Sequence, residues 1–414
     1  MEFGELTAKE YDEYLRNYPN KCFLQTSNIA TLREQWGWKK HFVGMKQQGK
    51  LVAATMMLSK KHGFHDEFYA LRGPIIDFNN LELLTAFIQK LKEYIRDHNG
   101  YMLRIDPYVI YHSRDSHGTI TPEIDHHKMV DHLKQVGFHP VLESEAIQAK
   151  YMYVIDLNSK SIDDIMREMT SKTRQMIRKN ERNGVVIRTG SIDDIELFAD
   201  IMAKTGERRQ FDDRGVSFYR DLYQALDRDQ MVRLIFAELD IKEALKKITE
   251  EQKMIKRNQL DREKKWQAGK MKEAKYQASQ QADMKKLDQL HQKQMAYEKL
   301  QTKHKDRITL GGIMYIIYGD EVASLYGGAY EEYIQYQPFY TIHDHMIRDA
   351  VENGYQLYNF YAIPDPHDLE SSQQGIYQFK KSFGGHVQEF LGEYVLPVRS
   401  LDFLLYKIKR KIKK

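Results

Sequence analysis

The sequence predicts a mixed α/β (α+β) fold of two similar units in tandem, with an antiparallel helical hairpin inserted into the second unit. Three observations predict it. At 414 residues, the chain is too long for one ordinary core. Short runs rich in aliphatic and aromatic residues, typical of buried strands, recur in both halves. All nine prolines lie at or before Pro140 or at or after Pro338, so none interrupts the centre.

The amino-terminal half contains the first set of expected elements. A hairpin is expected through 42–43 and 51–58, and a further strand at 68–74. An amphipathic helix is expected at 81–98, and a buried strand at 101–106. This order predicts an α/β unit in the first part of the chain.

The hairpin is expected at residues 241–306, where Lys, Glu, Gln, Ala and Met dominate and β-branched residues are few. The Ala268-Gly269 step is the expected turn between its two helices. A sparse apolar seam at roughly heptad spacing favours a coiled-coil arm. This segment has 18 Lys and Arg against 10 Asp and Glu, and such local basicity can mark contact with a polyanion.

Strands are expected on both sides of the hairpin, at 231–239 and 308–318. Without the hairpin, the order continues through a strand at 322–326 and a helix near 338–354, the layout of an N-acetyltransferase-type domain. The expected division of the chain has three parts. A first acetyltransferase-like domain spans 1–149 with 392–414, a second spans 150–240 with 307–391, and the arm spans 241–306.

Composition limits the compartment and the chemistry. No stretch approaches the roughly 18 apolar residues of a spanning helix, and the amino terminus is acidic, so we expect a cytoplasmic protein. The single cysteine, Cys22, is expected to be a buried small hydrophobe rather than a nucleophile. None of the 16 histidines comes with a supporting ligand set, so no metal site is expected.

Eight short strings along the chain carry a family resemblance. They are TLREQW (31–36), LRGPIID (71–77), LRIDP (103–107), SKTRQMIR (171–178), TGERRQF (205–211), LYGGA (325–329), YNFY (358–361) and GIYQFKKSFG (375–384). In this order, with a helical arm before the Gly-Gly strand, the chain resembles the FemABX aminoacyltransferases over essentially its whole length.

The resemblance implies transfer of an amino acid from aminoacyl-tRNA to the stem-peptide or bridge amine of a peptidoglycan precursor. It implies no metal and no nucleotide cofactor, with aminoacyl-tRNA as co-substrate. Because the donor ester is already activated, such an enzyme mainly needs positioning and oxyanion stabilisation. The lack of GxSxG and HExxH motifs agrees with this expectation.

The resemblance places the catalytic centre at Phe379-Lys380. The Lys380 ammonium would stabilise the oxyanion, and the Phe379 ring would stack on the terminal adenine of the tRNA. A carboxylate at Asp106 would hold the acceptor ammonium or take its proton. From the residues alone, the alternatives are a strand end with Phe379 in the core and Lys380 in solvent, and a turn residue at Asp106.

Five further residues are expected to bind the acceptor. Arg33 and Arg214 would clamp its diphosphate, since a guanidinium binds phosphate through two hydrogen bonds, although the family commonly has lysine where Arg33 stands. Phe218, Tyr219 and Tyr326 would line the acceptor cleft. Without the resemblance, surface arginines and core aromatics are the alternatives.

Two basic segments have two interpretations each. Residues 172–182 are basic at helical spacing, which indicates either phosphate contact or a solvated helix face. The tail at 401–414 combines apolar residues with six basic ones, as in an interfacial helix at an anionic inner membrane or in a frayed terminus. The membrane interpretation would suit a lipid-linked acceptor.

Two rival functions are weighed. An N-acetyltransferase using acetyl-CoA would share the fold, but its Arg/Gln-x-x-Gly-x-Gly/Ala loop is missing here. A non-enzymatic coiled-coil or RNA-binding adaptor would use the arm and would not need Lys380, Arg214 and Asp106. The sequence leaves open the choice among glycine, alanine and serine and the bridge position filled. It also leaves open a soluble, nucleotide-linked or a lipid-linked acceptor, the role of the arm, and the oligomeric state.

Overall fold

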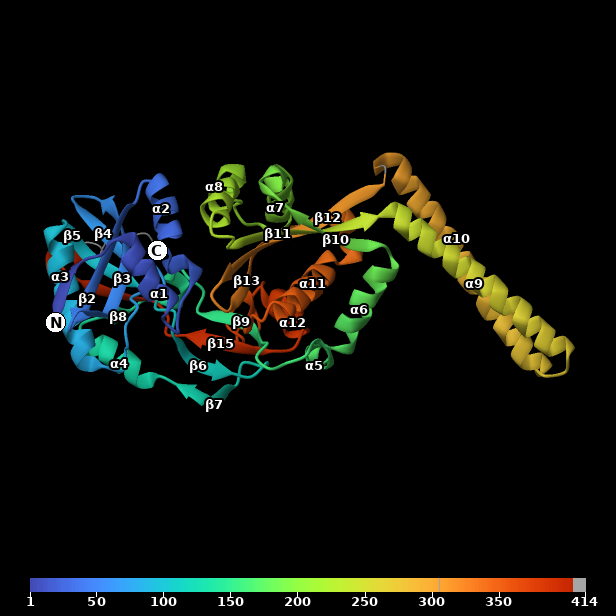
Figure 1. Cartoon of the computed structure of the whole chain (residues 1–414), viewed down its shortest axis with the longest axis horizontal. Coiled ribbons are helices and arrows are strands. Elements are labelled where there is room, and N and C mark those ends of the chain that lie inside the picture. The colour runs from blue at the N-terminus through green and yellow to red at the C-terminus, as the bar shows by residue number, and fades with distance from the viewer. Residues whose placement is uncertain (305, 405–414) are drawn as a thin grey trace.

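The computed structural model describes residues 1–304 and 306–404, whose strands form two sheets (Figure 1). The first sheet has the order β1-β2-β3-β4-β5-β16-β8. Its strands are β1 (Glu2–Glu5), β2 (Lys39–Gln47), β3 (Lys50–His62), β4 (His65–Ala70), β5 (Gly100–Ile105), β16 (Tyr394–Pro397) and β8 (His139–Pro140). Helices α1 (Ala8–Arg16) and α2 (Ser27–Gln35) pack on one face, and α3 (Leu81–Asp97) and α4 (His127–Gln135) pack on the other.

The second sheet has the order β10-β11-β12-β13-β14-β9-β15-β6-β7. Its strands are β10 (Val185–Gly190), β11 (Val232–Asp240), β12 (Arg307–Tyr318), β13 (Glu321–Ala329), β14 (Leu357–Ile363), β9 (Tyr151–Asp156), β15 (His386–Phe390), β6 (Ile110–Arg114) and β7 (Ile120–Asp125). Helices α7 (Ile195–Arg209) and α8 (Gly215–Asp227) cover one face. Helices α5 (Ile162–Glu168), α6 (Ser171–Arg182), α11 (Pro338–Glu352) and α12 (Gln374–Lys381) cover the other (Figure 1).

The two sheets confirm the predicted fold class of tandem α/β units with an inserted hairpin. The chain crosses between the two sheets four times, whereas a simple tandem arrangement requires one crossing. Strands β6 and β7 pair next to β15 in the second sheet, and β16 then returns to the first sheet beside β5. The expected domain boundaries therefore stay a prediction, with residues 110–125 paired to strands of the second unit.

The inserted arm consists of α9 (Ile241–Gln267) and α10 (Glu273–His304), which project from the body (Figure 1). The Asp240 carboxylate caps α9 by accepting a hydrogen bond from the Glu243 amide at 2.8 Å. At the predicted turn, Gly269 has φ +69°, a conformation that favours glycine. Near the body, Ile248 and Ile255 of α9 are buried together with Leu290 of α10.

One hydrophobic core joins the two units. Along β11, Leu234 and Phe236 face this shared core, while the alternate residues Ile235 and Ala237 face the core of the second unit. The first sheet contributes Met56 and other side chains to the shared core. The units are thus packed against each other through α1, α2, α7 and α8, as Figure 1 shows.

The second sheet opens between β13 and β14. These parallel strands pair only through residues 321–323 and 357–359. Beyond that point β13 stays paired with β12 as far as Ala329, whereas β14 pairs with β9 at Ala362 and Ile363, after a register shift. Tyr361, inside this irregularity, has φ +67°. Beyond residues 323 and 359, β13 and β14 are therefore not paired with each other, although they are neighbours at the middle of the sheet.

No helix in the described ranges, 1–304 and 306–404, is long and apolar enough to cross a membrane. Most of the predicted basic tail, from residue 405 onward, lies outside those ranges. Cys22 is buried, as predicted, and burial raises the pKa of its thiol to about 12.

Candidate active site

Lys380 lies on α12 at the opening between β13 and β14. Its Nζ donates a hydrogen bond of 2.6 Å to the carbonyl oxygen of Ala362, just after the irregular part of β14. Burial of the amine lowers the pKa of Lys380 to about 7. The alternative of a strand end with a solvated Lys380 is wrong, because the residue is helical and its side chain is partly buried.

Phe379 packs its ring among aromatic side chains next to Lys380. Its ring centroid lies 5.1 Å from that of Tyr340, 5.3 Å from that of Phe383 and 5.7 Å from that of His343. The ring is partly buried at the edge of the core of the second unit. It is thus held rigidly beside the amine.

His343, which the sequence did not single out, supports this pair from α11. Its Nδ1 lies 2.7 Å from the hydroxyl of Tyr358 and 3.1 Å from that of Tyr315. Burial, with a smaller contribution from the Lys380 charge, lowers the pKa of His343 to about 3, so the ring is neutral at physiological pH. No motif in the sequence would have marked this contact.

The two predicted clamp arginines flank a pair of aromatic rings that bridges the units. Arg33, on α2 of the first unit, places its guanidinium 5.2 Å from the centroid of Trp36. Arg214, just before α8, lies 5.4 Å from the centroid of Phe218. The rings of Trp36 and Phe218 are stacked with centroids 5.1 Å apart. Arg33 and Arg214 are therefore brought to one surface across the boundary between the units.

Tyr326 and Tyr219 complete the aromatic wall. The Tyr326 ring, on β13, lies 5.8 Å from Phe218 and 5.6 Å from Tyr219. Burial raises the pKa of Tyr326, while the charges of Arg214 and Arg33 oppose the rise, which places its hydroxyl near both guanidinium groups. Tyr219 is buried and donates to the Asp213 carboxylate at 2.7 Å, so it supports the wall from behind.

Asp106 directly follows β5 and is buried against Arg72. One carboxylate oxygen accepts a hydrogen bond from the Arg72 amide at 2.8 Å, and the other lies 3.5 Å from its Nε. That second oxygen, Oδ2, has no hydrogen-bond donor within the described residues. Burial raises the pKa of Asp106 to about 6, and Arg72 opposes the rise. The carboxylate is thus a buried group that faces Arg72 with both oxygens.

Arg72 connects Asp106 to the opening in the second sheet. Its guanidinium lies 5.7 Å from the ring of Tyr108, whose hydroxyl donates to Glu321 on β13 at 3.0 Å. Glu321 also accepts from the Asn359 amide at 2.6 Å. Arg72 lies within the LRGPIID string, but only the fold brings it to Asp106. Nothing in the sequence distinguishes Glu321 from a surface carboxylate.

The chain is similar to known proteins along its whole length. The sequence profile of the FemAB family matches residues 6–414. The chain belongs to the FemAB family. The aminoacyltransferase FemA of Staphylococcus epidermidis is 28% identical to this FemAB protein over 425 residues, which cover 100% of both chains. FemA of Staphylococcus aureus (strain MRSA252) is 28% identical over 428 residues, covering 100% of this chain and 99% of the relative.

The fold of this FemAB protein also has a counterpart among solved structures. A crystal structure of FemX superposes with a TM-score of 0.83 at 24% identity, covering 98% of this chain and 99% of that one. The family resemblance predicted from the sequence is confirmed. This FemAB protein is an enzyme. It is an aminoacyltransferase of the family that adds bridge amino acids to peptidoglycan precursors.

The predicted site residues of this FemAB protein fall into three groups. Lys380 and Phe379 lie at the opening of the second sheet, and Arg33, Arg214, Phe218, Tyr219 and Tyr326 form the wall between the units. Asp106 lies apart from both groups, in a buried pair with Arg72. Within residues 1–304 and 306–404, no cluster of His, Cys, Asp or Glu is arranged to hold a metal ion. The roles of these residues stay predictions.

Proposed function

We propose that the enzyme transfers glycine, alanine or serine from aminoacyl-tRNA to an amine of a lipid-linked peptidoglycan precursor at the inner face of the cell membrane. The observation that carries the proposal is the buried Lys380 amine at the opening of the second sheet, in a chain of the FemAB family. The donor, the amino acid and the lipid carrier all belong to the proposal.

The reaction needs an amine, an ester and a stabilised oxyanion. The neutral acceptor amine attacks the ester carbonyl of the donor, a C–N bond forms, and the C–O bond to the terminal ribose breaks. The amine proton ends on the ribose oxygen that leaves, so the products are an amide and free tRNA. Lys380 is poised to donate to the oxyanion, because a pKa of about 7 lets its protonated form be populated near neutral pH.

Asp106 is suited to a supporting role in this step. Its Oδ2, which lies 3.5 Å from the Arg72 Nε, can accept from the acceptor ammonium, or take its proton, if the precursor reaches the buried network. With a pKa raised to about 6, the carboxylate is mostly ionised at pH 7 and is more basic than an ordinary aspartate. The residue is 2% exposed, so access requires that the wall moves or that the amine enters through the opening.

Recognition of the acceptor would use the wall between the units. A diphosphate needs two or more cations at one surface, and Arg33 and Arg214 supply them from opposite units. The stacked Trp36 and Phe218 rings hold both guanidinium groups in place. A lipid-linked acceptor and peripheral membrane contact through the basic tail remain proposals that rest on the sequence alone.

The test is transfer of radiolabelled glycine, alanine or serine from charged tRNA to purified lipid-linked precursor. We expect label in the precursor with one of these donors, and strongly reduced label with Lys380→Ala and with Arg214→Ala. Lys381→Ala is the matched control, because this neighbouring lysine contacts the Tyr377 ring rather than Ala362. Transfer from acetyl-CoA in place of tRNA, or RNA binding without any transfer, would contradict the proposal.

A further inference from the structure

Helix α6 carries an unusual concentration of cations without matching carboxylates. Its twelve residues include Lys172, Arg174, Arg178, Lys179 and Arg182, against one acid, Glu181. Among the described residues, none of the five forms an ion pair with a carboxylate. Such a concentration of unpaired charge repels itself, and is typical of a surface that binds an anion.

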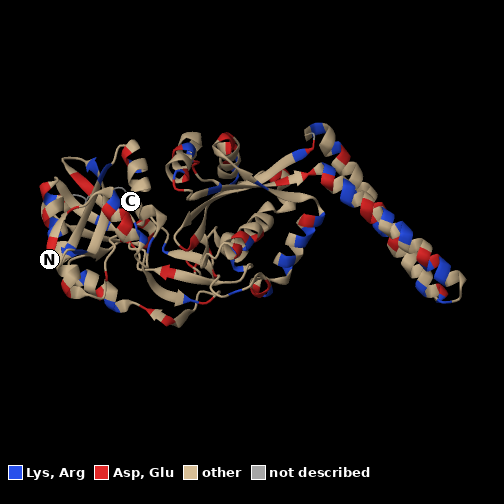
Figure 2. Ribbon diagram, viewed as in Figure 1, with Lys and Arg blue, Asp and Glu red and all other residues tan. Residues whose placement is uncertain are grey.

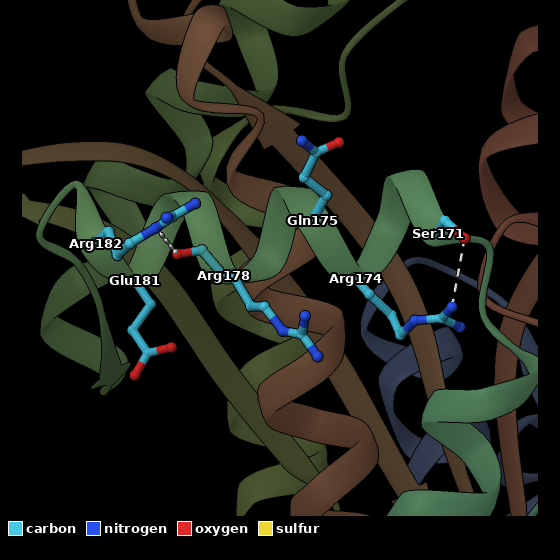
Figure 3. Close-up of a pocket in the computed structure, with 6 residues that line it drawn as sticks. All are labelled: Ser171, Arg174, Gln175, Arg178, Glu181 and Arg182. Atoms are coloured by element: carbon cyan, nitrogen blue, oxygen red, sulfur yellow. Dashed lines mark hydrogen bonds between the residues drawn. The ribbon is translucent and has the colours of Figure 1, made fainter. Parts of the chain in front are cut away.

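The cations of α6 line two neighbouring hollows, which share Arg174 and Arg178. One cavity of 620 Å³ is bordered by Arg174, Arg178 and Arg182, and Figure 3 shows Arg174 and Arg178 projecting from the same side of the helix. A neighbouring cavity of 820 Å³ also has Arg174 and Arg178 in its lining, and there Arg348 from α11 is paired with Asp344. Arginines four residues apart lie about 6 Å apart along a helix axis, so they can contact successive groups of an extended ligand.

One end of α6 lies against Ser382, at the end of the helix that carries the proposed catalytic lysine. The Thr170 amide donates to the carbonyl oxygen of Ser382 at 2.9 Å, and the Thr173 hydroxyl donates to the same oxygen at 2.9 Å. Ser382 is two residues beyond Lys380. The first turn of α6 is therefore fixed next to the end of α12 that carries the amine.

The other end of α6 meets the base of the arm. Lys293 of α10 donates to the Asn183 side chain at 2.6 Å, and Lys247 of α9 donates to the Glu181 carbonyl oxygen at 2.9 Å. Burial and then the nearby charges, including those of Arg182 and Lys179, lower the pKa of Lys293. A helix of twelve residues spans about 18 Å, so α6 forms a continuous basic track from the arm to the neighbourhood of Lys380.

The arm is less suited to bind a polyanion than its charge suggests. Arg262 pairs with Asp283, and Lys286 pairs with Glu251 across the two helices. Figure 2 shows acidic and basic residues interspersed along the arm, whereas α6 is predominantly basic. Helix α6 thus has one acid among five cations, whereas acids separate the cations along the arm.

We propose that α6 binds the phosphate backbone of RNA, and that under the proposed function this RNA is the acceptor arm of the donor tRNA. The guanidinium groups of Arg178 and Arg182 contact phosphates, and the track directs the aminoacylated end towards Lys380. This inference rests on the proposed function for the identity of the RNA, and on the unpaired cations of α6 for the place where it binds.

The experiment measures the Kd of the full chain for uncharged tRNA by fluorescence anisotropy over a range of salt concentrations. The α6 variant combines Arg178→Gln, Lys179→Gln and Arg182→Gln, three exposed positions. Arg174 is left intact because it donates to the carbonyl oxygens of Met166 and Met169. The control variant removes the same charge from the arm tip with Lys264→Gln, Lys265→Gln and Lys270→Gln, also at exposed positions.

We expect the Kd of the α6 variant for tRNA to rise at least roughly tenfold. The slope of the logarithm of the binding constant against the logarithm of the salt concentration should fall in magnitude by about 2, because roughly 0.7 to 0.9 counterions are released per phosphate contact. The arm-tip control should bind like the wild type. Arg178→Lys with Arg182→Lys should keep most of the slope, which separates lost charge from lost folding.

Three results would overturn the inference. The α6 variant could bind tRNA with the wild-type Kd and slope, or the arm-tip control could lose as much affinity as the α6 variant. The α6 variant could also keep tRNA binding while losing binding to phosphatidylglycerol vesicles, which would assign α6 to a membrane. Failure of the proposed function is distinguishable, because in that case the wild type would transfer no amino acid from charged tRNA to the precursor, whatever its Kd for tRNA.

Discussion

Replacement of Arg72 with methionine tests the buried network behind the acceptor wall. Arg72 and Asp106 are each 2% exposed, and the Arg72 guanidinium is 3.5 Å from the carboxylate. Methionine fills a similar volume but leaves the Asp106 charge buried without its partner. Removal of one partner of a buried pair costs about 3 to 5 kcal/mol, so we expect a loss of that size in the free energy of unfolding at pH 8.

The loss should depend on pH in a defined direction. In the wild type, the folded pKa of Asp106 is about 6, above the roughly 3.9 of an unfolded aspartate. The neutral carboxyl therefore contributes fully to the free energy of unfolding below about pH 4, and this contribution is lost as the pH rises to about 6. Above about pH 6, titration of Asp106 no longer changes the free energy of unfolding of the wild type. Without Arg72 the folded pKa rises further, so the variant should keep losing up to about 1.4 kcal/mol per pH unit above pH 6.

Urea unfolding followed by tryptophan fluorescence at pH 6 and pH 8 measures both effects. The double variant Arg72→Met with Asp106→Asn removes the unpaired charge, keeps an oxygen for the amide at position 72, and should recover most of the stability. A loss below about 1 kcal/mol at both pH values, or a double variant no more stable than Arg72→Met, would refute the reasoning.

Three further predictions concern the amine, the clamps and the packing of the Gly-Gly strand. Lys380→Met should lower the single-turnover transfer rate by about 10² to 10³, the usual loss of one oxyanion donor, and a change below about threefold would contradict that role. Arg33→Gln and Arg214→Gln should each raise the KM for the precursor by roughly tenfold with little change in kcat, when steady-state rates are measured with the donor in excess. A fall in kcat with an unchanged KM would contradict the role of these arginines in binding the diphosphate. Gly328→Ala should lower the free energy of unfolding by about 1 to 3 kcal/mol, because the added Cβ would lie 2.6 Å from an atom of α7. Thermal melting measures the loss. Gly375→Ala is the control, because a Cβ added at this position would have no atom within 4 Å.

Much of the fold could be predicted because local patterns determine it. The strand expected at 308–318 is β12, and the helix expected at 81–98 is α3, since hydrophobic runs and periodicity depend on neighbouring residues alone. The arm and its turn at Gly269 follow equally from composition. The pairing of β6 and β7 with the second sheet could not be predicted, because strand partners that lie more than 250 residues apart leave no local signal.

The site was predictable only through the family resemblance. No local pattern shows that Arg33 and Arg214 meet across two units, or that the Lys380 amine is shielded by its position at the sheet opening. The Arg72 partner of Asp106 depends on a contact between two strand ends 34 residues apart. The basic helix at 172–182 had two interpretations from the sequence, and its unpaired charges favour phosphate contact.

The most direct test of the central claim is the mass of the lipid-linked precursor after incubation with the wild-type enzyme and charged tRNA. The account predicts an increase by the residue mass of glycine, alanine or serine, with fragmentation placing the new amide on the stem-peptide or bridge amine. An unchanged precursor with all three donors, or an increase by an acetyl group when acetyl-CoA is supplied instead, would contradict it.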